Sequence, residues 1–532
     1  MGFISKQPYF GLSGGWLTFW ITLACGADMT LYGYDQGVFS GVVISQNFLE
    51  LHNLEGPSKT TLLGTTAAIY DVGCATGSLL AYWLGEKLGR RNTVVVGTII
   101  MSIGALLQCT SFSLGQMMTG RVIAGIGNGL NTSTAPVWQV ETSKVEWRGK
   151  LVILENCLVL VGFSLANWLN YGLSFVGGPV AWRFPLAFQF IFNIIIFSTV
   201  PWLPESPRWL IAHGREEEAL QIIADLEGKP VDDPFVQLQM TEIQYSVVYE
   251  RENSVSFRDI ITGKANQKAG TKTTRRLLLG MIGQSFQQFT GINVTSYYLP
   301  TVLQQSVGLS DTLSRLLTAV NSVQYLFFSL IGIFRVEQWG RRKLMMFGCG
   351  GCAFCYVFIT ALIRYNELDG YPHQKEVASA SVAFFFLYYV FFGIGMQGVT
   401  WLYATEINSL TMRTKGAALG AATNWIFNFM VVEITPIGIQ NLQWKFYIIW
   451  TVLNAAIVPI VYVFYPETSG RTLEDMDDYF RSNPPLLACL DKEGISSKRP
   501  EKYRLREQNH MHETKEDGTE PEAAQHLETA TA

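Results

Sequence analysis

Three short charged motifs occur twice in this chain, in the same order, with about 250 to 265 residues between the members of each pair. They are a Gly-Arg-Arg turn, a Glu followed after six residues by an Arg, and a Pro-Glu segment. The copies begin at Gly89 and Gly340, at Glu141 and Glu406, and at Pro204 and Pro466. Because the motifs lie between long apolar runs, they predict two equivalent halves, a pattern typical of membrane transporters.

Composition points to lipid as the solvent, since 48% of the 532 residues are hydrophobic and only 15% are charged. A spanning helix needs about 20 apolar residues, and about twelve such runs can be counted. They are 17–44, 62–84, 93–112, 116–140, 151–175, 184–203, 277–304, 313–336, 344–364, 378–404, 416–438 and 446–465. We therefore predict an all-α membrane protein with about twelve transmembrane helices in two pseudo-symmetric six-helix bundles.

The longest polar stretch, 205–276, is predicted to be a cytoplasmic linker with short helices between an N-terminal bundle at 16–204 and a C-terminal bundle at 277–465. Residues 1–15 would form a cytoplasmic N-terminus, and 466–532 a largely disordered cytoplasmic tail. If the loops between successive apolar runs are numbered from the N-terminus, Lys and Arg concentrate in the even-numbered ones. The positive-inside rule therefore places both termini in the cytoplasm.

Other function classes are disfavoured. The net charge of −4 is too small to indicate nucleic-acid binding. No phosphate-binding loop or nucleophile motif suggests an enzyme, and we expect no cofactor. Cys349, Cys352 and Cys355 resemble a metal motif, but they lie in an apolar run among glycines, where close helix packing explains them better.

The duplicated charges would lie at one membrane face. They could simply anchor topology. However, inter-helix ion pairs of roughly 0 to 1 kcal/mol each could together bias two conformations without freezing either. We therefore interpret the set as a cytoplasmic gate formed by Arg90, Arg91, Glu141, Arg148, Glu205, Arg208, Arg341, Arg342, Glu406, Arg413 and Glu467.

With these motifs, the chain from about Trp16 to Arg471 resembles the sugar porter family of the major facilitator superfamily. The resemblance rests on both Gly-Arg-Arg turns, on Gly120-Arg121 followed by Gly125, Gly127 and Gly129, on Pro-Glu-Ser-Pro-Arg at 204–208, on Gln-Gln-Phe-Thr-Gly-Ile-Asn at 287–293, and on Pro-Glu-Thr at 466–468. Segments 33–37 and 131–139 look closest to fungal monosaccharide and polyol permeases. The resemblance implies the major facilitator fold and alternating-access transport of a hexose or pentose across the plasma membrane, with proton symport as the expected coupling.

Amide side chains both donate and accept hydrogen bonds, as a sugar site requires, and the seventh run carries three of them around Thr290-Gly291. Hydrogen bonding between helices is the alternative. The resemblance implies sugar contacts at Asn156, Gln287, Gln288, Asn293, Asn321, Trp401 and Asn424. Asn156 stands where many relatives have Gln, and the tenth run lacks prolines that relatives have near Trp401, so we expect that helix to bend less readily.

Asp35 lies deep in the first run, where an unpaired charge costs at least about 2.5 to 3.5 kcal/mol. Arg121 in the fourth run is the expected partner, and the resemblance places the two together. We hypothesise that protonation of Asp35 frees Arg121 and so couples sugar movement to proton entry; the alternative is a fixed strut. Asp71, Glu155 and Glu433 are further intramembrane acids without an assigned role.

Two alternatives to symport stay open: a passive sugar or polyol (glycerol) facilitator, and a nutrient receptor that does not transport. The expected partners are a sugar or polyol, a proton and the lipid bilayer, with a monomer as the functional unit and no nucleic acid.

Overall fold

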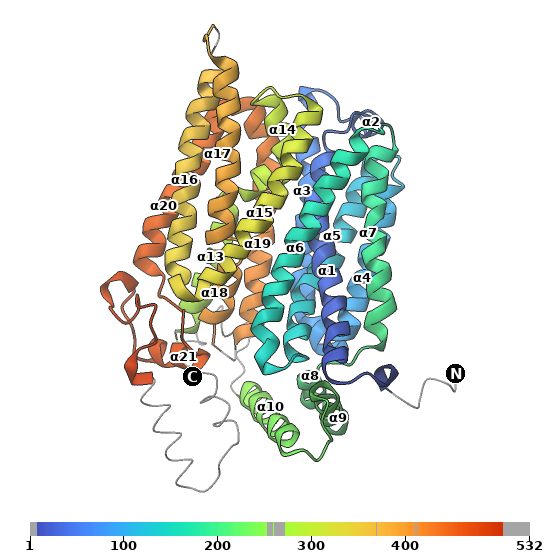
Figure 1. Cartoon of the computed structure of the whole chain (residues 1–532), viewed down its shortest axis with the longest axis vertical. Helices are drawn as coiled ribbons and strands as arrows, with labels where there is room; N and C mark the ends of the chain where they lie inside the picture. The colour runs from blue at the N-terminus through green and yellow to red at the C-terminus, as the bar shows by residue number, and fades with distance from the viewer. Residues whose placement is uncertain (1–7, 253–258, 260–271, 369, 410–411, 504–532) are drawn as a thin grey trace.

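The computed structural model describes residues 8–252, 259, 272–368, 370–409 and 412–503. Within them the chain is helical and contains no strand. The long helices run along one common axis, and the two halves of the chain stand beside each other (Figure 1).

The N-terminal half comprises α1 (Gly14–Val42), α3 (Thr60–Leu88), α4 (Arg90–Cys109), α5 (Leu114–Glu141), α6 (Val145–Ser174) and α7 (Val180–Thr199), with the short α2 (Gln46–Leu51) after α1. The C-terminal half comprises α13 (Thr273–Phe289), α14 (Ile292–Gln305), α15 (Asp311–Trp339), α16 (Arg341–Asn366), α17 (Gln374–Gly395), α18 (Val399–Ile407), α19 (Arg413–Leu442) and α20 (Phe446–Phe464). Each predicted apolar run coincides with one helix or with a consecutive pair, so the predicted all-α fold is confirmed.

Seven stretches of the described residues are long and apolar enough to cross a membrane. They contain α4, α6, α7, α15, α16, the α17–α18 pair and the α19–α20 pair. The remaining long helices, α1, α3, α5 and the α13–α14 pair, bury Asp, Asn, Gln and Gly residues along their length. These helices are less apolar because they carry buried polar groups, including Asp28, Asp35 and Asp71.

Two of the predicted runs are broken helices. The α13–α14 break falls at Thr290-Gly291, as expected, because Gly291 has a φ of 84° and an added Cβ would lie 2.6 Å from the Tyr356 hydroxyl. The α17–α18 break falls at residues 396–398, although no proline stands there. The expectation that this helix bends less readily is therefore wrong; the side chain of Gln287 bonds the carbonyls that the break leaves free, those of Met396 and Gln397.

Glycines allow the N-terminal helices to pack closely. A Cβ added to Gly125 would lie 2.2 Å from the Tyr70 carbonyl oxygen, and one added to Gly129 would lie 2.1 Å from that of Cys74. These two residues therefore press α5 onto α3, which is the packing role of small residues in membrane helices. The halves meet along α3 and α19 and along α6 and α15.

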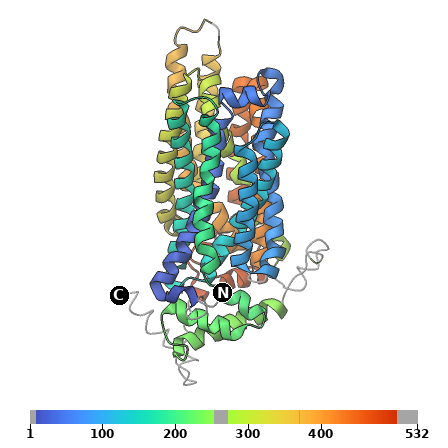
Figure 2. The same cartoon turned by 90° about the vertical axis from the view of Figure 1, so that its right-hand side faces the viewer.

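The segment between the halves folds into α8 (Pro207–Ala212), α9 (Glu216–Glu227) and α10 (Pro234–Glu252). These helices lie across one end of the bundle, and α21 (Leu473–Arg481) lies at the same end; we call this end the linker face (Figures 1 and 2). The opposite end, where α2 lies, is the far face. The predicted short helices between the halves are thus present.

Residues 466–503 are folded, so the expectation of a largely disordered tail is wrong for this part. The backbone N–H of Glu467 donates to the Gly494 carbonyl at 2.7 Å, and Arg499 pairs with Asp475 at 2.7 Å. Arg275 at the start of the C-terminal half donates to the Leu486 carbonyl at 3.0 Å. The polar residues that suggested disorder instead form ion pairs and hydrogen bonds within this segment, such as the Arg499–Asp475 pair. Residues 504–532 lie outside the described part.

Candidate substrate site

A cavity of about 70 Å³ lies between the two halves. A single water needs roughly 10 to 15 Å³ by the same kind of measure, so the cavity has room for several. Its described lining is made of amides, aromatic rings and small or apolar residues, and none of these side chains carries a charge. The lining is Tyr32, Gly33, Gln36, Val159, Leu160, Phe163, Gln287, Gln288, Ile292, Asn293, Ser296, Tyr325, Phe392, Gln397, Trp401, Asn424, Trp425 and Asn428.

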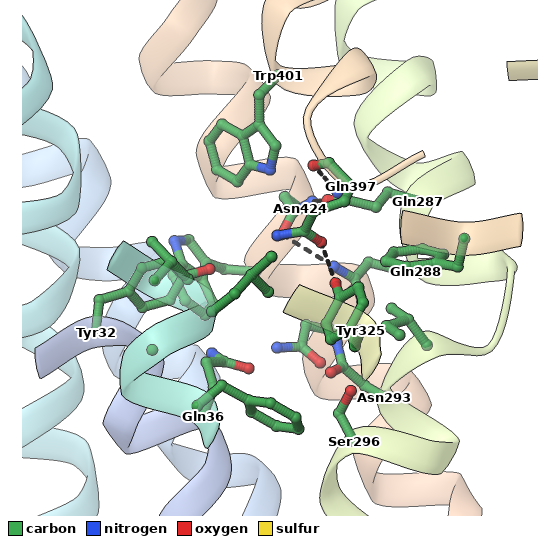
Figure 3. A pocket seen from close by; sticks show the side chains of 18 residues that line it. Tyr32, Gln36, Gln287, Gln288, Asn293, Ser296, Tyr325, Gln397, Trp401 and Asn424 are labelled. Atoms are coloured by element: carbon green, nitrogen blue, oxygen red, sulfur yellow. Dashed lines mark hydrogen bonds between the residues drawn. The ribbon is translucent and has the colours of Figure 1, made fainter. Parts of the chain in front are cut away.

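The amides on one side form a continuous hydrogen-bond chain (Figure 3). Asn293 Nδ2 donates to Gln288 Oε1 at 2.6 Å, and Gln288 Nε2 donates to Asn424 Oδ1 at 3.0 Å. Asn424 Nδ2 donates to Gln287 Oε1 at 2.8 Å and to Gln284 Oε1 at 2.9 Å. Asn424 is therefore the centre of a network that fixes which amide atoms face the cavity.

Five of the seven predicted sugar contacts line this cavity: Gln287, Gln288, Asn293, Trp401 and Asn424. The other two, Asn156 and Asn321, do not. The amide of Asn156 donates to the Val152 carbonyl of its own helix at 3.0 Å, and Val159 and Phe163 present the cavity face of α6 instead. On α15 the cavity residue is Tyr325, one turn after Asn321. For both predicted residues, the rotation of the helix turns a neighbouring position toward the cavity.

Several lining residues were missed by the sequence reasoning. Gln36 comes from α1 and its Nε2 is buried without a described partner, which leaves a donor free for a ligand. Tyr325 donates its hydroxyl hydrogen to Gln397 Oε1, which ties α15 to the α17–α18 break. Asn428 lies one turn after Asn424, and this i, i+4 spacing was the available signal that both share a helix face.

Asp35 and Arg121 are both buried, but in the described structure no ion pair joins them. Asp35 Oδ2 instead accepts from the Tyr70 hydroxyl at 3.0 Å. The Arg121 guanidinium lies 4.7 Å from the centre of the Tyr70 ring and donates to the carbonyls of Thr66 and Ala67. The expected direct pair is therefore corrected to an arrangement in which Tyr70 stands between the two charges.

The first duplicated cluster joins helices of the N-terminal half at the linker face. Glu205 Oε1 accepts from the backbone N–H groups of Arg90 at 2.8 Å and Arg91 at 3.2 Å, at the start of α4. The Arg90 side chain pairs with Glu141 at the end of α5, 3.0 Å away. Burial raises the pKa of Glu205, against the backbone donors that favour its charged form.

The second cluster repeats this geometry in the C-terminal half. Glu467 accepts from the backbone N–H groups of Arg341 at 2.8 Å and Arg342 at 3.2 Å, at the start of α16. Arg341 Nε lies 3.0 Å from Glu406 Oε2 on α18. In both halves a glutamate thus binds the positive end of a helix that begins with the two arginines of the Gly-Arg-Arg motif.

The remaining predicted gate residues, Arg208, Arg148 and Arg413, do not show a geometry that repeats between the two halves in the described part of the chain. Arg208 pairs with Glu250 of α10 at 2.6 Å, within the linker-face helices. The side chains of Arg148 and Arg413 lie outside the described residues. The ion pairs that the structure gives for the motif residues each stay within one half or the linker segment, so the motifs brace each half at this face.

Replacing Gly89 with alanine is expected to destabilise the protein, because Gly89 has a φ of 87° and an added Cβ would lie 2.3 Å from Glu205 Oε2. With a ψ of 173°, Gly89 lies in a backbone region that essentially only glycine adopts, and holding another residue there costs about 1 to 3 kcal/mol. We expect the melting temperature in detergent to fall by at least about 2 °C. Gly172→Ala on α6 is the control, since nothing lies within 4 Å of its added Cβ. An unchanged melting temperature for Gly89→Ala would contradict the described cap.

Comparison with known proteins places the chain in a family. The model of the family "Sugar (and other) transporter" matches residues 20–480. The MFS-type transporter oryC of Aspergillus oryzae is 61% identical over 506 residues, which cover 95% of this chain and 93% of oryC. The sugar transporter STL1 of Saccharomyces cerevisiae is 34% identical, over 90% of this chain and 84% of STL1.

A solved structure agrees with these matches. The proton:xylose symporter XylE, bound to 6-bromo-6-deoxy-D-glucose, has a TM-score of 0.72 and 25% identity to this chain. The match covers 87% of this chain and 99% of XylE. The predicted family resemblance is therefore confirmed: the chain belongs to the sugar porter family of the major facilitator superfamily.

Proposed function

We propose that this protein is a plasma-membrane monosaccharide transporter that works by alternating access and carries a proton with each sugar. The observation that carries the proposal is the uncharged, amide-lined cavity between the halves. Amides can donate to and accept from the same hydroxyl-rich ligand, and aromatic rings such as Trp401 suit its C–H faces. Since no charged residue lines the described cavity, a neutral polyol or sugar fits better than an organic acid.

The residues of the amide chain, Gln287, Gln288, Asn293 and Asn424, are the proposed sugar contacts, together with Trp401 and the free donor of Gln36. Asp35 is the proposed proton carrier. It is buried, and its described hydrogen bond comes from the neutral Tyr70 hydroxyl, with Arg121 acting on it across the Tyr70 ring. A protonated Asp35 would lose its attraction to Arg121 while keeping Tyr70 as a neighbour.

We further propose that the linker face is cytoplasmic, which follows from the basic motifs gathered there. The duplicated charges would then close the cytoplasmic side in one state and exchange partners when it opens. A single chain contains residues of both halves around a complete cavity, which supports a monomeric functional unit.

One observation favours passive transport as the second candidate. Asp35 already has a hydrogen-bond partner in Tyr70, which is what a fixed strut would need. Uptake distinguishes the two functions, because only a coupled transporter can concentrate its substrate.

The test is uptake of labelled hexoses, pentoses, glycerol and glucuronate into cells without their own sugar transporters, with and without a protonophore. We expect accumulation of a neutral monosaccharide that the protonophore abolishes, and no uptake of glucuronate. Uptake that only equilibrates, with or without the protonophore, would support the facilitator instead. Surface expression of the protein with no uptake of any compound would reject transport of these classes.

A further inference from the structure

Asp71 on α3 makes a hydrogen bond between the two halves of the protein. Its side chain is fully buried, and its Oδ1 accepts from Asn428 Nδ2 of α19 at 3.1 Å. Asn428 lines the cavity, one turn from Asn424 at the centre of the amide network. Asp71 therefore connects the N-terminal half directly to the side of the substrate site that the C-terminal half provides.

In both residues of this pair, the side-chain oxygen that takes no part in the hydrogen bond lacks a partner of its own within the described structure. Asp71 Oδ2 and Asn428 Oδ1 are buried and have no hydrogen-bond partner among the described residues. Both are acceptors when Asp71 is ionised, so they cannot satisfy each other. A single proton on Asp71 Oδ2 would give that oxygen a donor for Asn428 Oδ1 and close a two-bond pair between a carboxylic acid and a carboxamide.

The surroundings of Asp71 give an ionised carboxylate little support. In the described structure no Lys or Arg nitrogen lies within 4 Å of Asp71, and the cation acting on it, Arg121, donates to carbonyls of Thr66 and Ala67. The titratable groups that face this region are Tyr70 and Cys74 on α3, Tyr32 and Asp35 on α1, Arg121 on α5, Tyr297 and Tyr298 on α14, and Glu433 on α19.

The same interface has two further contacts between the halves toward the far face. The Thr65 hydroxyl of α3 donates to Glu433 of α19 at 2.6 Å, and Gln440 Nε2 donates to the Pro57 carbonyl at 3.1 Å. Asp71 and Asn428 form the deepest of these three contacts, next to the cavity. On the other side of Asp71, the preceding Tyr70 bonds Asp35. One turn of α3 thus contacts the proposed proton site and the opposite half.

We propose that Asp71 is a second protonatable positioning residue, whose proton completes the pair with Asn428 and latches the two halves together at the far side of the cavity. Loss of the proton sets a carboxylate oxygen against the Asn428 carbonyl oxygen and loosens the α3–α19 contact, which favours opening of the far face. The inference deepens the proposed proton symport, because it names a site where proton binding acts on the closing movement.

The test is a distance measurement between spin labels at two exposed residues of the far face: Lys59, directly before α3, and Asn441, near the end of α19. The half-exposed Cys109, Cys157 and Cys489 are first replaced by serine. A one-proton equilibrium changes up to tenfold per pH unit, so between pH 5.5 and 8.5 we expect the ratio of long to short distances to rise at least about tenfold. Asp71→Asn keeps a neutral amide opposite Asn428 and should stay at the short distance at both pH values.

The matched control is Asp28→Asn. Asp28 on α1 is also a buried acid bonded to an asparagine, with Asn131 Nδ2 at 2.7 Å, but both residues belong to the N-terminal half. This variant should keep the wild-type pH response. Asp71→Glu, which retains the acid, provides a second titratable variant if Asp71→Asn fails to fold. A pH response that survives in Asp71→Asn, or that the wild type lacks, would overturn the latch.

Uptake by the same labelled wild type separates this proposal from proton symport. A distance change that depends on Asp71, without concentrative uptake, would reject symport and keep the latch. Concentrative uptake with no such distance change would support symport and reject the latch.

Discussion

The Asp35→Asn protein is expected to equilibrate sugar across the membrane without concentrating it. Entry of one proton down a potential of 100 mV supplies about 2.3 kcal/mol, which corresponds to roughly 50-fold accumulation at about 1.4 kcal/mol per decade. Asparagine keeps the size of the side chain and can still accept from the Tyr70 hydroxyl, so the local packing should survive. It cannot carry a proton, and accumulation should fall from tens of fold to about onefold.

The measurement is the steady-state ratio of labelled sugar in proteoliposomes with an imposed potential, together with sugar exchange in the absence of any gradient. Asp28→Asn is the control, because it makes the same change two turns earlier on α1 at a residue bonded to Asn131. We expect exchange in both variants and accumulation only in Asp28→Asn. Accumulation by Asp35→Asn at the wild-type level would remove Asp35 from the coupling mechanism.

Asn424→Ala is expected to raise the sugar concentration for half-maximal uptake by about 100-fold. The substitution removes the residue that bonds Gln284, Gln287 and Gln288 together. Each buried amide left without its partner costs about 1 to 3 kcal/mol, and about 3 kcal/mol in total corresponds to roughly 100-fold. The substitution should weaken sugar binding more than it lowers the maximal uptake rate, since the amides lose their fixed orientation toward the cavity.

Asn156→Ala is the matched control for this prediction. Its amide bonds only the Val152 carbonyl in the described structure and does not line the cavity. We expect less than about a twofold change in half-saturation, because its loss leaves the amide network intact. Initial uptake rates over a range of sugar concentrations, normalised to protein at the cell surface, measure both variants. A large effect of Asn156→Ala with none for Asn424→Ala would show that the sugar binds elsewhere.

The helices of this protein were predictable because apolar runs of spanning length can satisfy their backbone groups in lipid only as helices. The break at Gly291 was also predictable, since the glycine lets the chain adopt a left-handed conformation. The break at residues 396–398 was not, because its carbonyls are bonded by Gln287 from a helix more than a hundred residues earlier. Local sequence holds no sign of such a long-range partner.

The candidate site was predicted best where several amides cluster. Gln287, Gln288 and Asn293 reach the cavity together, whereas the isolated Asn156 and Asn321 do not line it. A single residue depends on the rotation of its helix, which tertiary packing sets. The arrangement of Asp35 was missed for a similar reason, since its charge and the family resemblance both suggested Arg121, while the fold gives Asp35 a hydrogen bond from the Tyr70 hydroxyl.

The paired glutamate caps have a consequence for the order of biosynthesis. Glu205 follows the last helix of its half and binds the start of α4, so the N-terminal half is complete before α13 is translated. Glu467 does the same for α16, but it follows α20, the last long helix of the C-terminal half. The ribosome therefore delivers the second cap only after all the helices of both halves, and a nascent chain that stalls before Pro466 carries one finished half and one with an open end.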